Sequence, residues 1–81
     1  MSMSFKYKSN EQVAKEIKKL MLDEDVTQKN VADELGVTPQ AITKLLNKKN
    51  LSFSDVKKIL NTFGYDLVIL FGKNVVENEE D

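Results

Sequence analysis

The sequence predicts a mainly α-helical domain of four helices followed by one short β-strand. Four segments repeat apolar residues at the helical spacing, and each follows a serine or threonine that can cap a helix. Residues 65–71, YDLVILF, are too short for a standard helix and are rich in β-branched and aromatic residues between Gly64 and Gly72. Because 81 residues that are 41% hydrophobic can form one small core, we expect a single domain over residues 1–76. An acidic, disordered tail is expected over residues 77–81.

The first helix is expected to run from a cap at Ser9 to about Asp23. Ser9 is followed three residues later by Gln12, which is the spacing of a capping box. The apolar residues of this helix are Val13, Ile17, Leu20 and Met21.

A sharp turn separates the second helix from the third. Thr27 can cap the second helix, and Gly36 suits the left-handed conformation that ends it. Thr38 can cap the third helix, and Pro39 suits its first position because no amide hydrogen is needed there. The small side chain of Ala32 lets the two helices pass closely, since a longer one would hold their backbones apart. The residues expected to be buried around this turn are Val31, Ala32, Leu35, Val37, Ile42 and Leu45, with Val37 filling the corner.

Burial of Ile42 and Leu45 turns the other side of the third helix outward. That side carries Gln40, Ala41, Thr43 and Lys44, a short set that is largely polar and basic.

A polar loop over residues 47–50 leads to the fourth helix, which Ser52 can cap and Gly64 can end. Its expected inner face consists of Phe53, Val56, Ile59, Leu60 and Phe63.

The strand over residues 65–71 needs a partner, because an open edge would expose backbone donors and acceptors beside apolar side chains. Residues 3–8 alternate, with Phe5 and Tyr7 on one face, and can pair with the strand inside one chain. Alternatively, two copies of the strand can pair across a twofold axis. We favour the second arrangement, and the N-terminal strand can add to the same sheet.

Composition excludes several classes of function. The chain has no cysteine and no histidine, which rules out disulfides, thiolate or histidine metal sites, and Ser-His or Cys-His catalysis. Its carboxylates show no spacing of a catalytic pair, so we expect no enzymatic activity, no cofactor and no metal. No apolar run approaches the roughly 20 residues of a membrane span, and no cleavable leader is evident. We therefore expect a cytoplasmic protein without a membrane partner.

The net charge of −1 conceals a basic region. Between residues 38 and 58, five lysines stand against one aspartate, a local balance of +4, whereas residues 77–81 contribute four carboxylates. All 12 basic residues are lysines, which supply a point charge and lack the forked contact of arginine with guanine. A polyanionic partner beside the third helix is therefore expected.

The pattern over residues 28–47, QKNVADELGVTPQAITKLLN, is typical of a helix-turn-helix motif. With its flanking helices, this region resembles the Cro/repressor-type (XRE) family of transcriptional regulators over residues 13–64. The resemblance implies binding of double-stranded DNA, with the third helix in the major groove. The positions that carry the resemblance are Val31, Ala32, Leu35, Gly36, Val37, Ile42 and Leu45.

The C-terminal strand extends this resemblance to oligomeric state. GYDLVILF after the fourth helix is similar to the strand through which some Cro-like proteins and helix-turn-helix antitoxins dimerise. A homodimer is implied, which would read an inverted repeat. The implied dimerisation residues are Tyr65, Leu67, Ile69 and Phe71.

The resemblance also implies roles for individual side chains. Gln40 is expected to pair with adenine, Thr43 to contact a thymine methyl group, and Lys44 to reach the acceptors of guanine. Pro39 departs from the family, because the related position often carries a side chain that hydrogen-bonds to DNA, whereas proline offers only apolar contact. The expected contacts to the DNA backbone are Gln28, Thr38, Asn47, Lys48, Lys49 and Ser52.

Three functions stay open at this point. The first is a transcriptional regulator, expected to be a repressor, that acts as a homodimer on an inverted-repeat operator. The second is a DNA-binding antitoxin that also masks a toxin protein through its strand or acidic tail. The third is a protein-interaction module that does not bind DNA.

Overall fold

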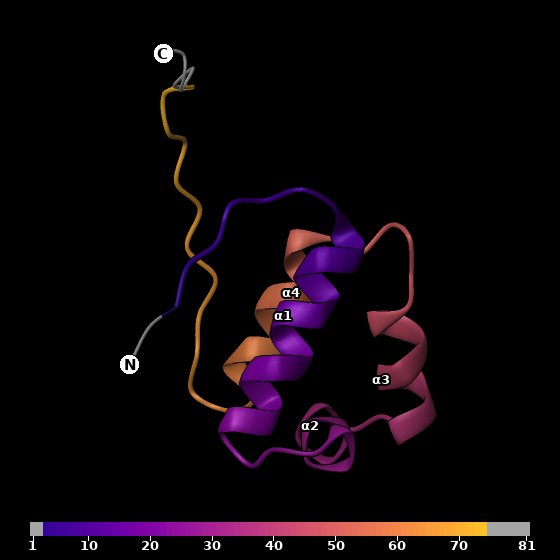
Figure 1. The fold of residues 1–81 in the computed structure, drawn as a ribbon. Helices are drawn as coiled ribbons and strands as arrows, with labels where there is room; N and C mark the ends of the chain where they lie inside the picture. Colours follow the sequence, from indigo (N-terminus) through magenta and orange to yellow (C-terminus); the bar gives the residue numbers. More distant parts are fainter. Residues whose placement is uncertain (1–2, 75–81) are drawn as a thin grey trace.

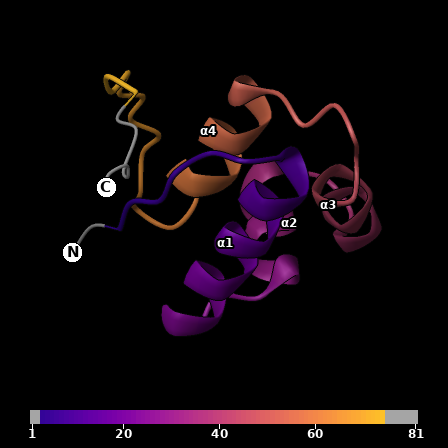
Figure 2. The same cartoon turned by 45° about the horizontal axis from the view of Figure 1, so that its top comes forward.

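The computed structural model describes residues 3–74, in which the chain forms four helices (Figure 1). α1 and α4 lie alongside each other, α2 lies across one end of this pair, and α3 stands at the edge of the molecule (Figures 1 and 2). The mainly α-helical prediction is confirmed. The predicted acidic tail, residues 77–81, lies outside the described residues. The helices are α1 Asn10–Asp23, α2 Gln28–Leu35, α3 Pro39–Leu46 and α4 Phe53–Asn61.

Each helix begins directly after the serine or threonine that the sequence predicts as its cap. The hydroxyl oxygen accepts a hydrogen bond from a backbone amide of the first turn. The amides there have no acceptor within the helix itself. In α2 and α4 the bond is reciprocated by Asn30 and Asp55, which completes a capping box. The donor amides and acceptor hydroxyls are Gln12 to Ser9 (3.1 Å), Asn30 to Thr27 (3.0 Å), Ala41 to Thr38 (3.2 Å) and Asp55 to Ser52 (3.0 Å).

The turn between α2 and α3 has the predicted backbone conformation, but the predicted burial of Val37 at its corner is wrong. Gly36 adopts the left-handed conformation with φ 71° and ψ 33°, and Pro39 occupies the first position of α3. Val37, expected to fill the corner, is instead 44% exposed. Its amide donates to the Ala32 carbonyl at 2.9 Å, so the backbone of Val37 closes the turn while its side chain faces solvent.

One hydrophobic core joins all four helices. Val31 and Ala32 of α2 are completely buried, as the close approach of α2 to α3 requires. Leu35 and Leu45 are partly buried against this core. The buried members are Ala14, Ile17, Leu20, Met21, Val31, Ala32, Ile42, Leu46, Leu51, Val56, Ile59 and Leu60.

The inner face of α4 is shorter than predicted. Phe53 was expected to be buried but is 64% exposed. Because helical side chains tilt towards the N-terminus, a residue at the first position projects beyond the helix end, past the reach of the core. Phe63 is partly buried, but it lies in the turn that follows α4.

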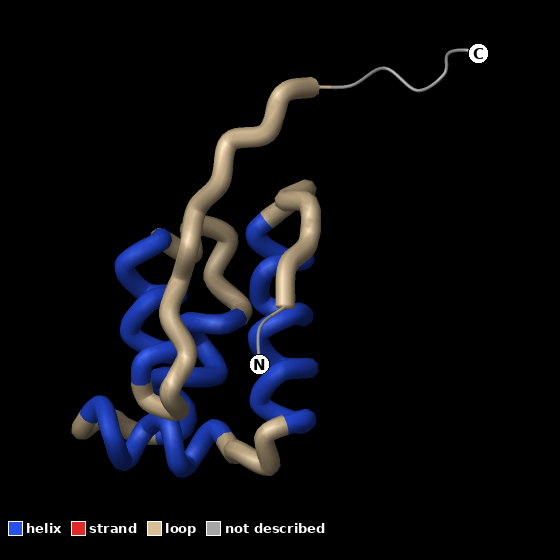
Figure 3. Tube along the Cα trace, turned by 90° about the vertical axis from the view of Figure 1, so that its left-hand side faces the viewer, coloured by secondary structure: helices blue, strands red, loops and turns tan. Residues whose placement is uncertain are grey.

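The C-terminal segment is extended, and no β-strand occurs within residues 3–74 (Figure 3). Residues 3–8 and 65–71 overlap in Figure 1 but are separated in Figure 3, and no backbone hydrogen bond joins these two described segments. The pairing within one chain that the sequence allowed is therefore not formed. The amide of Tyr65 donates to the Leu60 carbonyl at 3.0 Å, and Asp66 pairs with Lys57 of α4 at 2.7 Å, so the start of the segment is held against α4.

Candidate nucleic-acid interface

The outer face of α3 is polar and open to solvent. Gln40, Thr43 and Lys44 are all exposed, whereas Ile42 and Leu46 on the opposite side are buried. Residues three and four apart share one face of a helix, so these three side chains form a single surface. α3 stands at the edge of the molecule (Figure 2), and its hydrogen-bonding groups are therefore available to a partner.

The start of α2 lies against this surface. Gln28, half-buried at the first position of α2, places its Oε1 2.5 Å from the Thr43 hydroxyl. The same hydroxyl lies 3.2 Å from the Pro39 carbonyl oxygen. The structure thus brings together one predicted backbone contact and one predicted base contact, although 15 residues separate them in the sequence.

Two predicted backbone contacts also act as helix caps. The hydroxyl oxygens of Thr38 and Ser52 accept the cap bonds of α3 and α4. A hydroxyl that accepts such a bond still has its own proton to donate, for example to a phosphate oxygen. Both residues are exposed, so capping does not prevent a second contact.

Three exposed lysines lie in the last turn of α3 and in the loop that follows it, and we call Lys44, Lys48 and Lys49 the groove lysines. The ion pairs within residues 3–74 include only Lys48 from this set, whose Nζ lies 3.7 Å from Asp55 Oδ2. Asn47, also exposed, caps the C-terminus of α3 beside them. The charges of Lys44 and Lys49 are therefore more available to a polyanion than that of Lys48.

The carboxyl group of Asp55 experiences opposing influences. Partial burial by itself raises its pKa, but hydrogen bonds from Ser52 and the positive charges of Lys48 and Lys58 outweigh this effect. The net result is a pKa below the ordinary value of 3.8, so Asp55 stays charged at neutral pH. Its charge stabilises the first turn of α4 and attracts Lys48.

The loop that carries two groove lysines is held by a residue that the sequence did not single out. Asn10 Nδ2 donates to the Lys49 carbonyl oxygen at 2.6 Å, and Asn10 Oδ1 accepts from the Tyr7 hydroxyl at 3.0 Å. This contact joins the start of α1 to the loop between α3 and α4. Because 39 residues separate Asn10 from Lys49, no local sequence pattern could have revealed it.

The four residues expected to mediate dimerisation divide into two pairs. Tyr65 and Leu67 pack partly against the core of their own chain. The Tyr65 hydroxyl also donates to Glu24 at 2.8 Å, and this bond raises the pKa of Tyr65. Ile69 and Phe71 are 50% and 95% exposed and have no such packing. The segment is thus packed against the core at its start and exposed to solvent further along.

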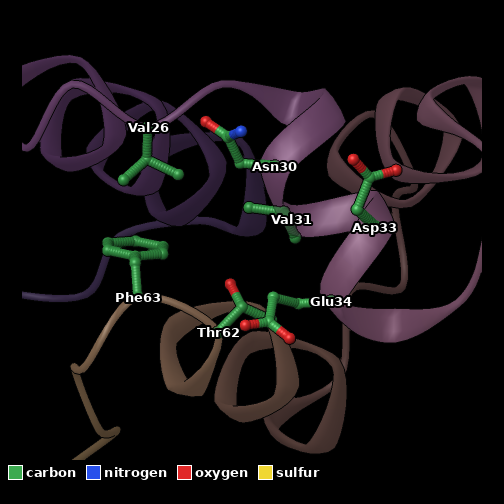
Figure 4. A pocket seen from close by; sticks show the side chains of 7 residues that line it. All are labelled: Val26, Asn30, Val31, Asp33, Glu34, Thr62 and Phe63. Atoms are coloured by element: carbon green, nitrogen blue, oxygen red, sulfur yellow. The ribbon is translucent and has the colours of Figure 1, made fainter.

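A separate hollow of about 410 Å³ lies between α2 and the end of α4 (Figure 4). Two carboxylates, Asp33 and Glu34, line it, and Asp33 accepts a hydrogen bond from Lys29 at 2.8 Å, which raises the pKa of that lysine. Carboxylates repel a phosphate backbone, so this hollow is not part of the nucleic-acid surface. Its lining residues are Val26, Asn30, Val31, Asp33, Glu34, Thr62 and Phe63.

Residues 3–74 hold neither a metal cluster nor a membrane-spanning helix. No three His, Cys, Asp or Glu side chains gather there as a metal site would require. None of the helices there combines the length and the apolar character needed to cross a bilayer.

The fold and the exposed face of α3 together define a helix-turn-helix domain. A helix-turn-helix family model matches residues 17–70, well over half of the chain. The chain therefore belongs to the helix-turn-helix family of XRE type, a family of DNA-binding regulators rather than of enzymes. Neither the curated proteins nor the solved structures that we searched contain a match to this chain.

Proposed function

We propose that this protein is a homodimeric transcriptional repressor that reads an inverted-repeat operator through the major groove of double-stranded DNA. The observation that carries the proposal is the outer face of α3, where Gln40, Thr43 and Lys44 are exposed while Ile42 is buried behind them. A helix that enters the major groove needs this division into a polar outer face and an apolar inner face.

The three outer side chains match distinct base edges. The Gln40 amide has one acceptor and one donor group, which suit the N6 and N7 atoms of adenine. Lys44 suits the two acceptors of guanine, and the methyl group of Thr43 suits that of thymine. Because there is no arginine in the chain, discrimination rests on these contacts and on the fit of the helix to the groove.

Contacts to the phosphate backbone position the helix. Thr38, Ser52 and Asn47 supply hydrogen bonds, and the groove lysines supply charge. The Asn10 bond to the Lys49 carbonyl supports this assignment, since it orders the loop before any DNA arrives. Gln28 stands at the start of α2, where the helix dipole favours an anion.

The dimer is proposed to form through the C-terminal segment. Val68, Leu70 and Phe71 are 85%, 89% and 95% exposed. Successive residues of an extended chain point to opposite faces, so this segment is apolar on both sides, as in a strand buried on both faces. Pairing with the same segment of a second copy would satisfy its backbone groups and cover these side chains.

A twofold dimer gives the proposal its geometry and its mode of regulation. Two recognition helices in successive major grooves would stand about 34 Å apart and read a near-palindromic site. A dimer seated on such a site excludes other proteins from the same stretch of duplex, which is why we propose repression.

The test is selection from a random duplex library at low and moderate salt, with the mass of the bound species measured in parallel. An enriched inverted repeat bound by a dimer would support the proposal. A reporter gene placed behind the selected site should then be less active when the protein is present. A stable dimer that enriches no sequence would refute it.

A second candidate, an antitoxin, is supported by the same exposed apolar segment over residues 68–71, because a partner of another kind could cover it. A second small protein that copurifies in a fixed ratio and is displaced by the Phe71→Asp change would favour the antitoxin. Absence of DNA binding even at low salt would instead favour a protein-interaction module.

A further inference from the structure

The Thr43 hydroxyl lies 2.5 Å from Gln28 Oε1 and 3.2 Å from the Pro39 carbonyl oxygen. A hydroxyl has a single proton to donate, and the shorter of the two contacts is the stronger hydrogen bond. Both acceptors lie within the protein, so the hydroxyl of Thr43 is directed towards α2 and its own helix.

The rotamer of Thr43 follows from these contacts. Threonine is branched at Cβ, so fixing the hydroxyl in one staggered position also fixes its methyl group in another. Thr43 is exposed on α3, and because its proton is engaged, the hydroxyl cannot donate to a base, which leaves the methyl group for apolar contact. That group recognises the C5-methyl of thymine by apolar contact.

We propose that Gln28 is a positioning residue for base reading, which holds Thr43 in the rotamer that selects thymine through its methyl group. The inference rests on the proposed function and deepens it. Gln28 uses only its amide oxygen for this purpose. Its NH₂ group keeps two donors, which can bind a phosphate at the start of α2. The Gln28 side chain would thus contact a DNA phosphate and also orient the side chain that reads a base.

Pro39 cannot hold Thr43 through its own side chain. Proline at the first position of α3 has no side-chain donor or acceptor that could hold a neighbour. The side-chain contact to Thr43, one turn further along α3, comes instead from Gln28.

The experiment compares binding to the selected operator with binding to the same operator in which deoxyuridine replaces individual thymines. Deoxyuridine lacks only the C5-methyl group. With the wild-type protein, one thymine per half-site should be sensitive, with binding weakened about fourfold, the value of one methylene-sized apolar group leaving water. Gln28→Ala should abolish this sensitivity and also weaken binding to every duplex.

Gln28→Glu is the matched variant. A glutamate keeps an oxygen that can accept from Thr43 but has no donor for phosphate and adds a negative charge. It should therefore bind all duplexes more weakly while preserving the thymine-to-uracil ratio. Thr43→Ser removes the methyl group, so it should bind the thymine and deoxyuridine operators equally well. In a Thr43→Val protein, adding Gln28→Ala should leave the thymine-to-uracil affinity ratio unchanged.

The outcomes separate the two proposals. Two results would overturn the positioning role and leave the proposed function intact, provided that binding is sequence-specific. One is a thymine-to-uracil affinity ratio that is unchanged in Gln28→Ala; the other is a ratio of one at every thymine when the wild-type protein binds the site. A wild-type protein that selects no sequence would overturn both.

Discussion

Replacement of Ala32 by leucine tests how closely α2 and α3 approach each other. Ala32 and the adjacent Val31 have no exposed surface, and α2 and α3 are in mutual contact. Leucine adds three carbons to the side chain. In free space their burial would stabilise the fold by about 2.4 kcal/mol, at roughly 0.8 kcal/mol for each methylene-sized group. A close-packed interior has no such space, so we expect a net loss of about 1–3 kcal/mol in the free energy of unfolding.

The expected loss in Ala32→Leu is a large fraction of the total free energy of unfolding. A domain of this size has a free energy of unfolding of about 4–12 kcal/mol, and each kcal/mol corresponds to roughly 4–8 °C in Tm. Thermal and urea unfolding followed by circular dichroism would measure it. All proteins should be compared at one concentration, because the proposed dimerisation would make Tm depend on concentration.

Ala41→Leu is the matched control. It makes the same substitution in a neighbouring helix at an exposed position, where a change within about 0.5 kcal/mol is expected. If Ala32→Leu unfolds at the same midpoint as Ala41→Leu, or at a higher one, the close approach of α2 and α3 does not depend on a small residue and the packing argument is wrong.

Three further predictions concern charge and assembly. If all six groove lysines of the two subunits release counterions, log affinity should fall against log salt with a slope of about −5.4, and Lys48→Gln, which leaves four of these lysines, should bring it to about −3.6; a slope near zero would remove the electrostatic interface. Asp55 has a lowered pKa, so its charge stabilises the fold above pH 4 and this contribution is lost as pH falls through the folded-state pKa. In urea unfolding, Asp55→Asn should therefore be less stable than wild type by about 0.3–1 kcal/mol at pH 7, with a deficit that shrinks as the pH is lowered below 3.8, and a deficit that does not change with pH would contradict the assignment. Phe71→Asp should convert the proposed dimer to a 9.2 kDa monomer in sedimentation equilibrium, whereas Phe53→Asp, at another exposed phenylalanine, should leave it intact; a dimer that survives Phe71→Asp is not held by this segment.

The helix starts were predictable because their causes are local. Ser9, Thr27, Thr38 and Ser52 each act on an amide three residues away, and the left-handed turn at Gly36 needs only the absence of a side chain. The exposed set on α3 was predictable for a similar reason, since the 3.6-residue repeat places Gln40, Thr43 and Lys44 opposite the buried residues.

The errors came from ends and corners. Val37 lies in the turn between α2 and α3, and Phe53 stands at the first position of α4, and the core covers neither apolar side chain. Periodicity assigns a residue to a face and does not say how far the core extends along that face. The strand predicted over residues 65–71 depends on a partner for its backbone groups, and the single chain supplies none within residues 3–74.

The sequence by itself determined the four helices, their caps, the tight turn and the side of α3 that faces outward, because each follows from interactions within one or two helical turns. Only the tertiary structure decided which distant side chains meet. Gln28 with Thr43, Asn10 with the Lys49 carbonyl, and Tyr65 with Glu24 are joined across 15, 39 and 41 residues. Such contacts depend on how the helices pack against one another, and packing is set by the shape of the whole core rather than by the spacing of neighbouring residues.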